Sequence, residues 1–294
     1  MEFGLALPNL GAGSSAEGIE AAADVAERLG YTTVWTTDHL VTDHAAAPTY
    51  GRMFEAILTL AHLAGRTKKV KLGVSVIVVP QRQAVLVAKE LATLDVLSRG
   101  RVIAGVGVGW NKIEMANVEM GDRFKVRGAY TDETIAVWRH LWSGSTEPFE
   151  GRFTHLTDFV FDPLPVQPGG PPIVVGGSSE PAYRRAGRLG DSYHFSVAAP
   201  AAVERRLPVV RAAAEAAGRP MPLVSGRARV RFDSKPPEGE PYAMAGTAEE
   251  IATEVRAFES LGVSHLVLVL NETNIEKYVG TVERFHREVI PLLG

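Results

Sequence analysis

The chain has 294 residues, of which 46% are hydrophobic, with a formal net charge of −3 and no cysteine. The lack of cysteine excludes disulfides, thiolate metal ligands and thiol nucleophiles, and the balanced charge without a basic tract argues against nucleic acid or an anionic membrane surface as a partner. No apolar run reaches the roughly 18–20 residues of a membrane helix, and the start MEFGLALPNL lacks the pattern of a secretory signal, so we expect a cytoplasmic protein.

The first hundred residues alternate between strand-like and helical hydrophobic patterns. Ser14 and Glu17 have the spacing of a capping box, which predicts a helix that begins there and ends before Gly30. Predicted strands cover residues 3–8, 32–37, 70–79 and 101–104, and predicted helices cover residues 14–29, 52–65 and 83–98. In the last of these helices, the residues expected to face inward are Val85, Leu86, Leu91, Leu94 and Leu97.

The second half repeats the same alternation after one interruption. Residues 145–172 are rich in proline and read as a hairpin, so we expect an insertion region there and not a domain boundary. Thr247 and Glu250 form a second capping-box pattern, with Gly262 as the stop. Predicted strands cover residues 173–175, 192–197, 223–232 and 265–270, and predicted helices cover residues 131–142, 180–189, 202–217, 247–261 and 275–289.

Eight strand-then-helix units in fewer than 300 residues predict an α/β fold, a single-domain (β/α)8 TIM barrel over residues 1–294. Helices between consecutive strands require parallel pairing with right-handed crossovers. An open, doubly wound sheet is the alternative. In a barrel the functional residues lie where the strands end at the carboxyl face, so the residues at those ends are the candidates.

The stretch SRGRVIAGVGVGWN, residues 98–111, is the most unusual of these strand ends. A buried strand leads into Gly105, Gly107 and Gly109, and glycine lets other atoms approach the backbone closely. The spacing fails the third glycine of a dinucleotide fingerprint because Trp110 follows. The run predicts either a ligand-binding backbone or a plain turn into a helix.

Three other strand ends carry chemistry-bearing residues. Asp38 and His39 end the second strand, where a carboxylate beside a histidine favours a proton donor, although an Asp cap and a packed His are the alternative. Asp43 and His44 follow, but without cysteine or an H-x-H pattern we expect no metal site. The sequence GGSS at 176–179 opens a predicted helix, which favours either an anion site or a simple N-cap.

The pattern resembles the bacterial-luciferase-like flavin and deazaflavin oxidoreductases, in particular the branch that uses coenzyme F420. The resemblance covers nearly the whole chain in the expected order. The matching pieces are VWTTDH at 34–39, LGVSVIVVP at 72–80, KELATLDVLSRGRVIAGVGVGW at 89–110, RGAYTDE at 127–133, PPIVVGGSS at 171–179 and RAGRLGD at 185–191.

The resemblance implies a (β/α)8 barrel with an insertion region and an F420 or, alternatively, FMN cofactor in its mouth. His39 matches a candidate proton donor that Asp38 orients or charge-tunes, and Ser75 and Val76 match the site of a non-prolyl cis peptide against the cofactor ring. The implied cofactor-binding residues are Asp38, Ser75, Val76, Val108, Gly109, Gly176, Gly177, Ser179 and Glu180.

Two departures from the family pattern bear on the substrate. Trp110 stands where the sugar-phosphate dehydrogenases of this family carry a basic Glu, and Ile113 stands where they carry a cofactor-contacting Asn. We therefore expect a small organic substrate that is fairly apolar, with Trp110 and Tyr50 in its pocket.

The leading hypothesis is an F420-dependent oxidoreductase that passes hydride between reduced deazaflavin and such a substrate. An FMN-dependent luciferase-like monooxygenase is the alternative enzyme, and a non-catalytic flavin- or deazaflavin-binding protein is the alternative from another class. Expected partners are the small-molecule substrate and a flavin or F420 reductase that supplies reduced cofactor, and family members commonly form homodimers.

Overall fold

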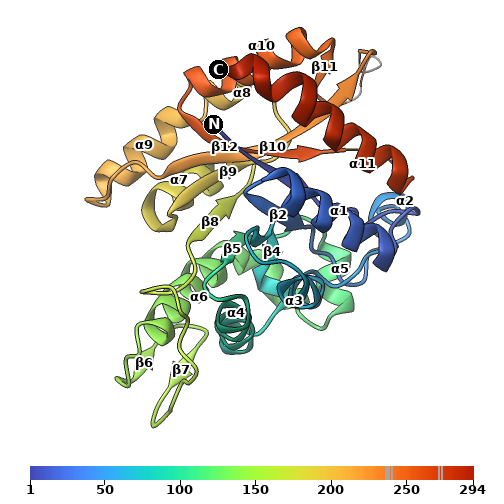
Figure 1. The fold of residues 1–294 in the computed structure, drawn as a ribbon. Coiled ribbons are helices and arrows are strands. Elements are labelled where there is room, and N and C mark those ends of the chain that lie inside the picture. The colour runs from blue at the N-terminus through green and yellow to red at the C-terminus, as the bar shows by residue number, and fades with distance from the viewer. Residues whose placement is uncertain (236–238, 240, 271, 273) are drawn as a thin grey trace.

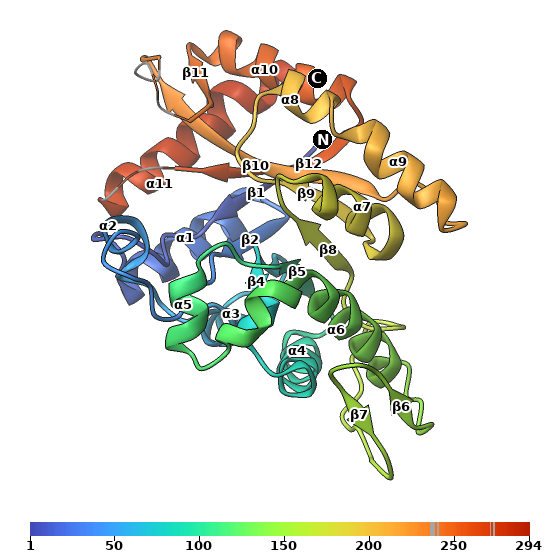
Figure 2. The same ribbon diagram turned by 180° about the vertical axis from the view of Figure 1, so that it is seen from behind.

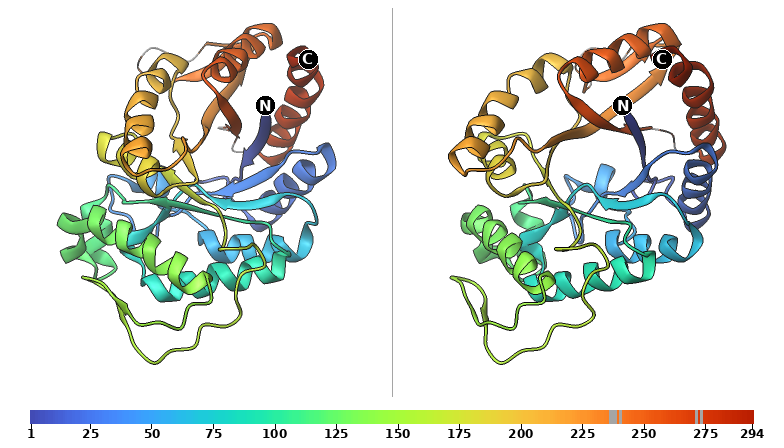
Figure 3. Two further views of the ribbon diagram at one scale, coloured as in Figure 1. Left: turned by 90° about the vertical axis from the view of Figure 1, so that its left-hand side faces the viewer. Right: turned by 60° about the vertical axis from the view of Figure 1, so that its left-hand side comes forward.

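The computed structural model describes residues 1–235, 239, 241–270, 272 and 274–294. Within these residues, eight parallel strands pair side by side into a closed ring, with helices around the outside (Figures 1 and 3). The strands are β1 (Glu2–Ala6), β2 (Thr33–Thr36), β3 (Lys71–Val74), β5 (Val102–Gly107), β8 (Ile173–Gly176), β9 (Ser192–Phe195), β10 (Leu223–Phe232) and β12 (Val263–Val269). The predicted (β/α)8 barrel is confirmed.

Pairing of the first strand with the last closes the ring. β1 pairs in parallel with β2 on one side, with Gly4 opposite Thr33, and with β12 on the other side, with Phe3 opposite Leu266. β9 pairs with β10 at the remaining junction. Because all eight strands run in parallel, their carboxyl ends meet at one rim, which is where a TIM barrel places its site.

Two short strands depart from the predicted pattern. The predicted strand at 70–79 is interrupted after Val74, and β4 (Ile77–Val78) continues the pairing with β5. β11 (Ala243–Gly246) was not predicted and pairs in parallel with the outer part of β10, with Arg229 opposite Ala243.

The predicted helices surround the strands with small differences in their bounds. α1 begins at Ala16 and its cap is Ser15, whose side chain accepts from Gly18 N, so the prediction that Ser14 is the cap is wrong. The capping box of Thr247 and Glu250 is confirmed. The main helices are α1 (Ala16–Leu29), α3 (Ala56–Arg66), α4 (Ala84–Ser98), α6 (Arg127–Trp142), α7 (Glu180–Leu189), α9 (Leu207–Ala216), α10 (Ala248–Ser260) and α11 (Ile275–Arg284), with short helices α2 (Ala47–Tyr50), α5 (Lys112–Asn117) and α8 (Pro200–Glu204).

Helix α4 packs through a different face from the one predicted. Leu91 and Leu94 are buried as expected, but Leu86 and Leu97 are 56% and 64% exposed. Small residues fill the inward positions of the helix, among them Ala88, because α4 lies close to the strands and to α3. A helix that is apolar on several faces does not reveal its buried face by periodicity.

The insertion region projects away from the barrel. Strands β6 (Phe149–Glu150) and β7 (His155–Leu156) form a small antiparallel hairpin, as the alternation predicts. In Figures 1 and 2 this hairpin extends below α6, away from the ring. Of the residues that the structure describes, none belong to a helix long and apolar enough to cross a membrane.

Candidate active site

The strand end after β3 carries the most irregular backbone at the rim. The peptide bond between Ser75 and Val76 is cis, as the resemblance implies. Ser75 Oγ lies 3.0 Å from His194 Nε2, and His194 Nδ1 lies 2.9 Å from Ser225 Oγ, so a polar chain crosses the inside of the ring. Burial lowers the pKa of His194 well below its ordinary value, which keeps its ring neutral.

The glycines of β5 and β8 make room for Val76. A Cβ placed at Gly107 would lie 2.3 Å from Val76 Cγ2, and one placed at Gly176 would lie 2.5 Å from Val76 Cγ1. The sequence left open a ligand-binding backbone or a plain turn at the glycine run, and the atoms that approach Gly107 and Gly176 are the Val76 methyl groups. Val76 itself is only half-buried, so the glycines hold an apolar surface at the rim.

Asp38 is buried in an ion pair with Arg82. Arg82 Nη2 lies 2.6 Å from Asp38 Oδ1 and also donates to Glu55 Oε1 at 2.8 Å. The backbone N–H of Val78 donates to Asp38 Oδ2 at 2.9 Å. Asp38 therefore ties β4 to the end of β2, and its carboxylate is fully engaged by protein groups.

The carboxylate that contacts His39 is Glu114 of α5. Glu114 Oε2 accepts from His39 Nδ1 at 2.6 Å, and Glu114 Oε1 accepts from Leu40 N at 2.6 Å. Burial alone raises the pKa of Glu114, but the hydrogen bonds from His39 and Leu40 outweigh it and hold that pKa below its ordinary value. The prediction that Asp38 orients His39 is corrected here, because the ring is oriented by Glu114.

The position of Glu114 follows from the short helix α5. Asn111 caps this helix with its side-chain oxygen, which accepts from Ile113 N and Glu114 N at 3.0 and 3.1 Å. The cap places the Glu114 side chain one helical turn beyond the glycine run, facing the end of β2. A buried acidic residue directly after a glycine-rich strand end was the available sequence signal, and the sequence interpretation did not use it.

Tyr50 and Trp110 lie beside His39. The ring centroids of His39 and Tyr50 are 4.3 Å apart, those of His39 and Trp110 are 5.9 Å apart, and those of Tyr50 and Trp110 are 6.1 Å apart. His39 is 8% exposed, whereas Trp110 is 59% exposed. His39 and Tyr50 belong to the connection between β2 and α3, and Trp110 follows β5. The three side chains form an aromatic cluster at the rim, and His39 Nε2 is the ring nitrogen not used by Glu114.

The remaining predicted cofactor contacts are spread over neighbouring strand ends. Gly109 follows β5 with φ +72°, after the half-buried Val108. Gly177 follows β8, and its carbonyl accepts from Tyr193 Oη at 3.3 Å. Ser179 is the N-cap of α7 and Glu180 its first residue; both are exposed, and Glu180 pairs with Arg184 at 2.6 Å.

Strand β10 contributes a cation that the sequence interpretation missed. Arg227 Nη1 lies 3.3 Å from Thr37 Oγ1 and 3.3 Å from Ser75 O, and its Nε is buried without a partner in the described part of the chain. Both acceptors are neutral. The alternation of arginines in the segment RARVR, residues 227–231, was the sequence signal, because alternate residues of a strand share one face.

The side chains that bind metal ions in proteins are chiefly those of His, Cys, Asp and Glu. Across the described residues there is no group of three or more His, Cys, Asp or Glu side chains placed to hold a metal ion. Asp43 instead caps the turn before α2 and accepts from Asn111 Nδ2 at 2.6 Å.

Comparison with known proteins places the chain in a family. A family model described as luciferase-like monooxygenase matches residues 1–235. Two proteins named F420-dependent glucose-6-phosphate dehydrogenase are similar: one from Amycolatopsis mediterranei is 34% identical over 57% of this chain but only 50% of its own length, and one from Kineococcus radiotolerans is 26% identical over 91% and 90%.

Solved structures share the fold over their whole length. An F420-dependent secondary alcohol dehydrogenase, solved with an F420-acetone adduct, has a TM-score of 0.84 at 21% identity, and the match covers 100% of this chain and 99% of that one. The oxygenating part of 3,6-diketocamphane monooxygenase from Pseudomonas putida, solved with FMN, has a TM-score of 0.82 at 16% identity over 99% and 98% of the two chains. The chain therefore belongs to the luciferase-like monooxygenase family, a family of oxidoreductases.

Proposed function

We propose that this protein is an F420-dependent oxidoreductase that passes hydride from the reduced cofactor to a fairly apolar organic substrate. The observation that carries the proposal is the pair of His39 and Glu114 at the barrel rim, beside Tyr50, Trp110 and the half-buried Val76. The relatives and neighbours whose names include F420 support the choice of cofactor.

The residues at the rim fit a flat, partly anionic ring. Val76 offers an apolar face that Gly107 and Gly176 hold in place. Arg227 adds a buried Nε–H donor without a partner in the described residues, which suits an electron-rich heterocycle edge. Under the proposal Asp38, Ser75, Val76, Val108 and Gly109 line the ring site, and the phosphate side of the cofactor lies against Gly176, Gly177, Ser179 and Glu180.

The proposed chemistry divides between the cofactor and His39. Bound F420 would supply the hydride, which is the difficult part of the reaction. Because the Glu114 carboxylate only accepts, His39 Nδ1 donates to it, and Nε2 remains to give a proton to the substrate oxygen. This step requires a ring with a proton on each nitrogen, and the Glu114 carboxylate lies 2.6 Å from Nδ1, where it pairs with the charge of that ring.

The aromatic and aliphatic residues at the rim favour an apolar substrate. Trp110, Ile113 and Leu40 are 59%, 55% and 38% exposed around His39 and Glu114. Apolar side chains that are exposed together beside a candidate proton donor are typical of a ligand-binding surface. Trp110 and Tyr50 would form the walls nearest to the reacting carbon.

FMN is the second candidate cofactor, because the family model is described as one of monooxygenases and an FMN complex shares the fold. Titration of the purified protein with oxidised F420 and with FMN, followed by absorbance and fluorescence, separates the two. We expect tight binding of F420. Preferred binding of FMN would reject the proposal in favour of an oxygenase served by a flavin reductase, and binding of either without turnover of any substrate would favour a carrier protein.

We further propose a homodimer formed through α3 and α4. Leu58 of α3 is 71% exposed, and Leu86 and Leu97 of α4 are also exposed, on two neighbouring helices. Analytical ultracentrifugation of the wild type and of the Leu97→Arg variant tests this proposal. We expect the wild type to be a dimer and the variant to be a monomer. A monomer at micromolar concentration would reject the dimer and leave the proposed chemistry untouched.

A further inference from the structure

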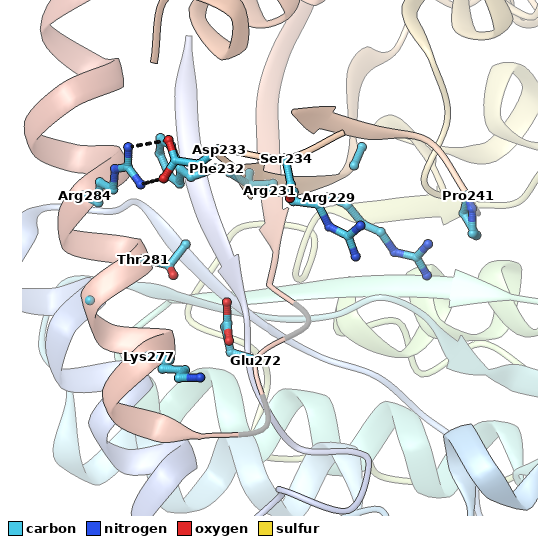
Figure 4. A pocket seen from close by; sticks show the side chains of 13 residues that line it. Arg229, Arg231, Phe232, Asp233, Ser234, Pro241, Glu272, Lys277, Thr281 and Arg284 are labelled. Atoms are coloured by element: carbon cyan, nitrogen blue, oxygen red, sulfur yellow. Dashed lines mark hydrogen bonds and ion pairs between the residues drawn. The ribbon is translucent and has the colours of Figure 1, made fainter. Parts of the chain in front are cut away.

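A cavity of about 560 Å³ lies beyond the carboxyl end of β10, between that strand, β11 and α11 (Figure 4). Four of its lining side chains are cationic, namely Arg229, Arg231, Lys277 and Arg284, and two are carboxylates, Asp233 and Glu272. Asp233 is already engaged, since its Oδ1 accepts from Arg284 Nη2 at 3.0 Å. Among the other lining side chains, Arg229 and Lys277 contribute two cations and Glu272 one carboxylate.

The arginines of this cavity continue the inner face of β10 outward from the rim. Arg227 and Arg229 are two residues apart on one strand, so their side chains share a face, while Ala228 and Val230 alternate with them and are buried on the opposite face. Figure 4 shows the side chains of Arg229 and Arg231 on the side of the cavity away from Arg284, with Lys277 on the α11 wall.

Two arginines of β10, Arg227 and Arg229, each have a buried Nε–H without a hydrogen-bond partner among the described residues. Burial lowers the pKa of Arg227. Tyr50 raises this pKa and the neighbouring charge of Arg229 lowers it further. A buried guanidinium with unused donors destabilises the folded protein unless an anion pairs with it. An anionic ligand would therefore accept hydrogen bonds from both arginines and offset this cost.

Arg227, two residues before the cavity-lining Arg229 on the same strand, contacts residues of the candidate active site. Arg227 reaches Thr37 and Ser75 at the rim, and it interacts electrostatically with Tyr50, whose ring lies 4.3 Å from His39. A ligand that follows this face of β10 from Arg229 past Arg227 would have its other end beside Tyr50 and Trp110. The two ends meet surfaces of opposite character, one cationic and one apolar.

We propose that Arg229, with Arg227 beside it and Lys277 across the cavity, binds the carboxylate of an amphipathic organic acid whose apolar part reaches His39. A planar guanidinium can hold a carboxylate through two parallel hydrogen bonds. This inference rests on the proposed function and deepens it, because it names the substrate class of the same site. The acidic side chain of F420 would also suit these cations. The experiment therefore measures binding of the cofactor and binding of the organic acid separately.

The test is calorimetric titration of F420-loaded protein with a series of phenylalkanoates, from 3-phenylpropionate to 6-phenylhexanoate, each matched with its phenylalkanol. The variants are Arg229→Gln, Arg229→Lys and, as a control of equal charge change, Arg211→Gln on the exposed surface of α9. F420 binding is measured separately for each variant by fluorescence, and circular dichroism checks that each variant is folded.

We expect at least one acid to bind about tenfold more tightly than its alcohol, the effect of one charge-assisted hydrogen bond. Arg229→Gln should remove this preference, Arg229→Lys should keep part of it, and Arg211→Gln should keep all of it, with F420 affinity unchanged throughout. The proposal is overturned if no acid is preferred, if the preference survives Arg229→Gln, or if Arg229→Gln weakens F420 binding and leaves the acids unaffected. An acid preference that depends on Arg229 in a protein that does not bind F420 would support the anion site and reject the proposed function.

Discussion

Glu114 and His39 are 75 positions apart in the chain, and a hydrogen bond of 2.6 Å joins Glu114 Oε2 to His39 Nδ1. Glu114 also accepts from the backbone of Leu40, so it holds both the ring and the loop that carries it. A side chain fixed in this way can exchange a proton without a change of rotamer, which is the geometric requirement for a general acid.

Glu114→Gln should weaken the folded state in a pH-dependent way. The pKa of Glu114 is lowered in the folded protein, so the ionised carboxylate contributes stability above its ordinary pKa, and that contribution is lost as the pH falls through the lowered value. Urea unfolding should show a wild-type advantage of about 1–3 kcal/mol at pH 7 that shrinks towards pH 3.5. The exposed Glu147→Gln should show no such dependence, and a gap that stays constant with pH would contradict the assignment.

His39→Ala should abolish proton donation and leave cofactor binding intact. We expect kcat to fall by about 100-fold or more, because general acid catalysis contributes 10²–10⁴-fold. His44→Ala is the matched control, since His44 is an exposed histidine in the same loop. Stopped-flow measurement of cofactor oxidation provides the readout, and equal rates for both variants would remove His39 from the mechanism.

Gly107→Ala should displace Val76, because its Cβ would lie 2.3 Å from Val76 Cγ2. Overpacking of this kind costs about 1–3 kcal/mol, and we expect weaker cofactor binding as well. The double variant Gly107→Ala/Val76→Ala should recover part of the lost stability, because the clashing methyl group is then absent. Gly65→Ala on α3 meets no atom within 4 Å and should be neutral or stabilising. Thermal unfolding of the wild type, Gly107→Ala, Val76→Ala and the double variant checks the cycle, and additive effects would show that the two residues do not interact.

Arg82→Gln should leave Asp38 buried without its counter-charge. The Arg82 and Asp38 side chains are 13% and 0% exposed, and removal of one partner of such a pair costs about 3–5 kcal/mol. The exposed pair of Arg184 and Glu180 is the control, and Arg184→Gln should cost less than about 1 kcal/mol. Chemical denaturation measures both, and Asp38→Asn combined with Arg82→Gln should be less destabilised than Arg82→Gln alone.

Much of the fold could be predicted because each element has its own local signal. Alternating apolar residues mark the strands, and the capping box of Thr247 and Glu250 marks the start of α10. The errors lie where the local signal is degenerate. Ser14 and Ser15 are equally good caps, and α4 carries leucines on more than one face, so only packing against α3 and the strands decides that Leu86 and Leu97 face outward.

The strand ends that carry Asp38, His39 and the glycine run follow from the sequence alone, because a parallel barrel brings all carboxyl ends to one rim. Their contacts do not follow. Asp38 precedes His39 in the chain, yet it pairs with Arg82, and His39 pairs with Glu114. Consecutive residues of an extended chain point to opposite sides, so neighbours in sequence are seldom partners in space.

The sequence by itself determined the alternation of strands and helices, the family resemblance and part of the set of residues at the rim, because these depend on short-range hydrophobic patterns and motifs. The tertiary structure decided which carboxylate holds His39, which side chain the glycines accommodate, and that the arginines of β10 face a cavity. Those facts depend on contacts between residues far apart in the chain, 75 positions for His39 and Glu114 and 152 for Arg227 and Ser75, and on burial, which only the packed chain defines.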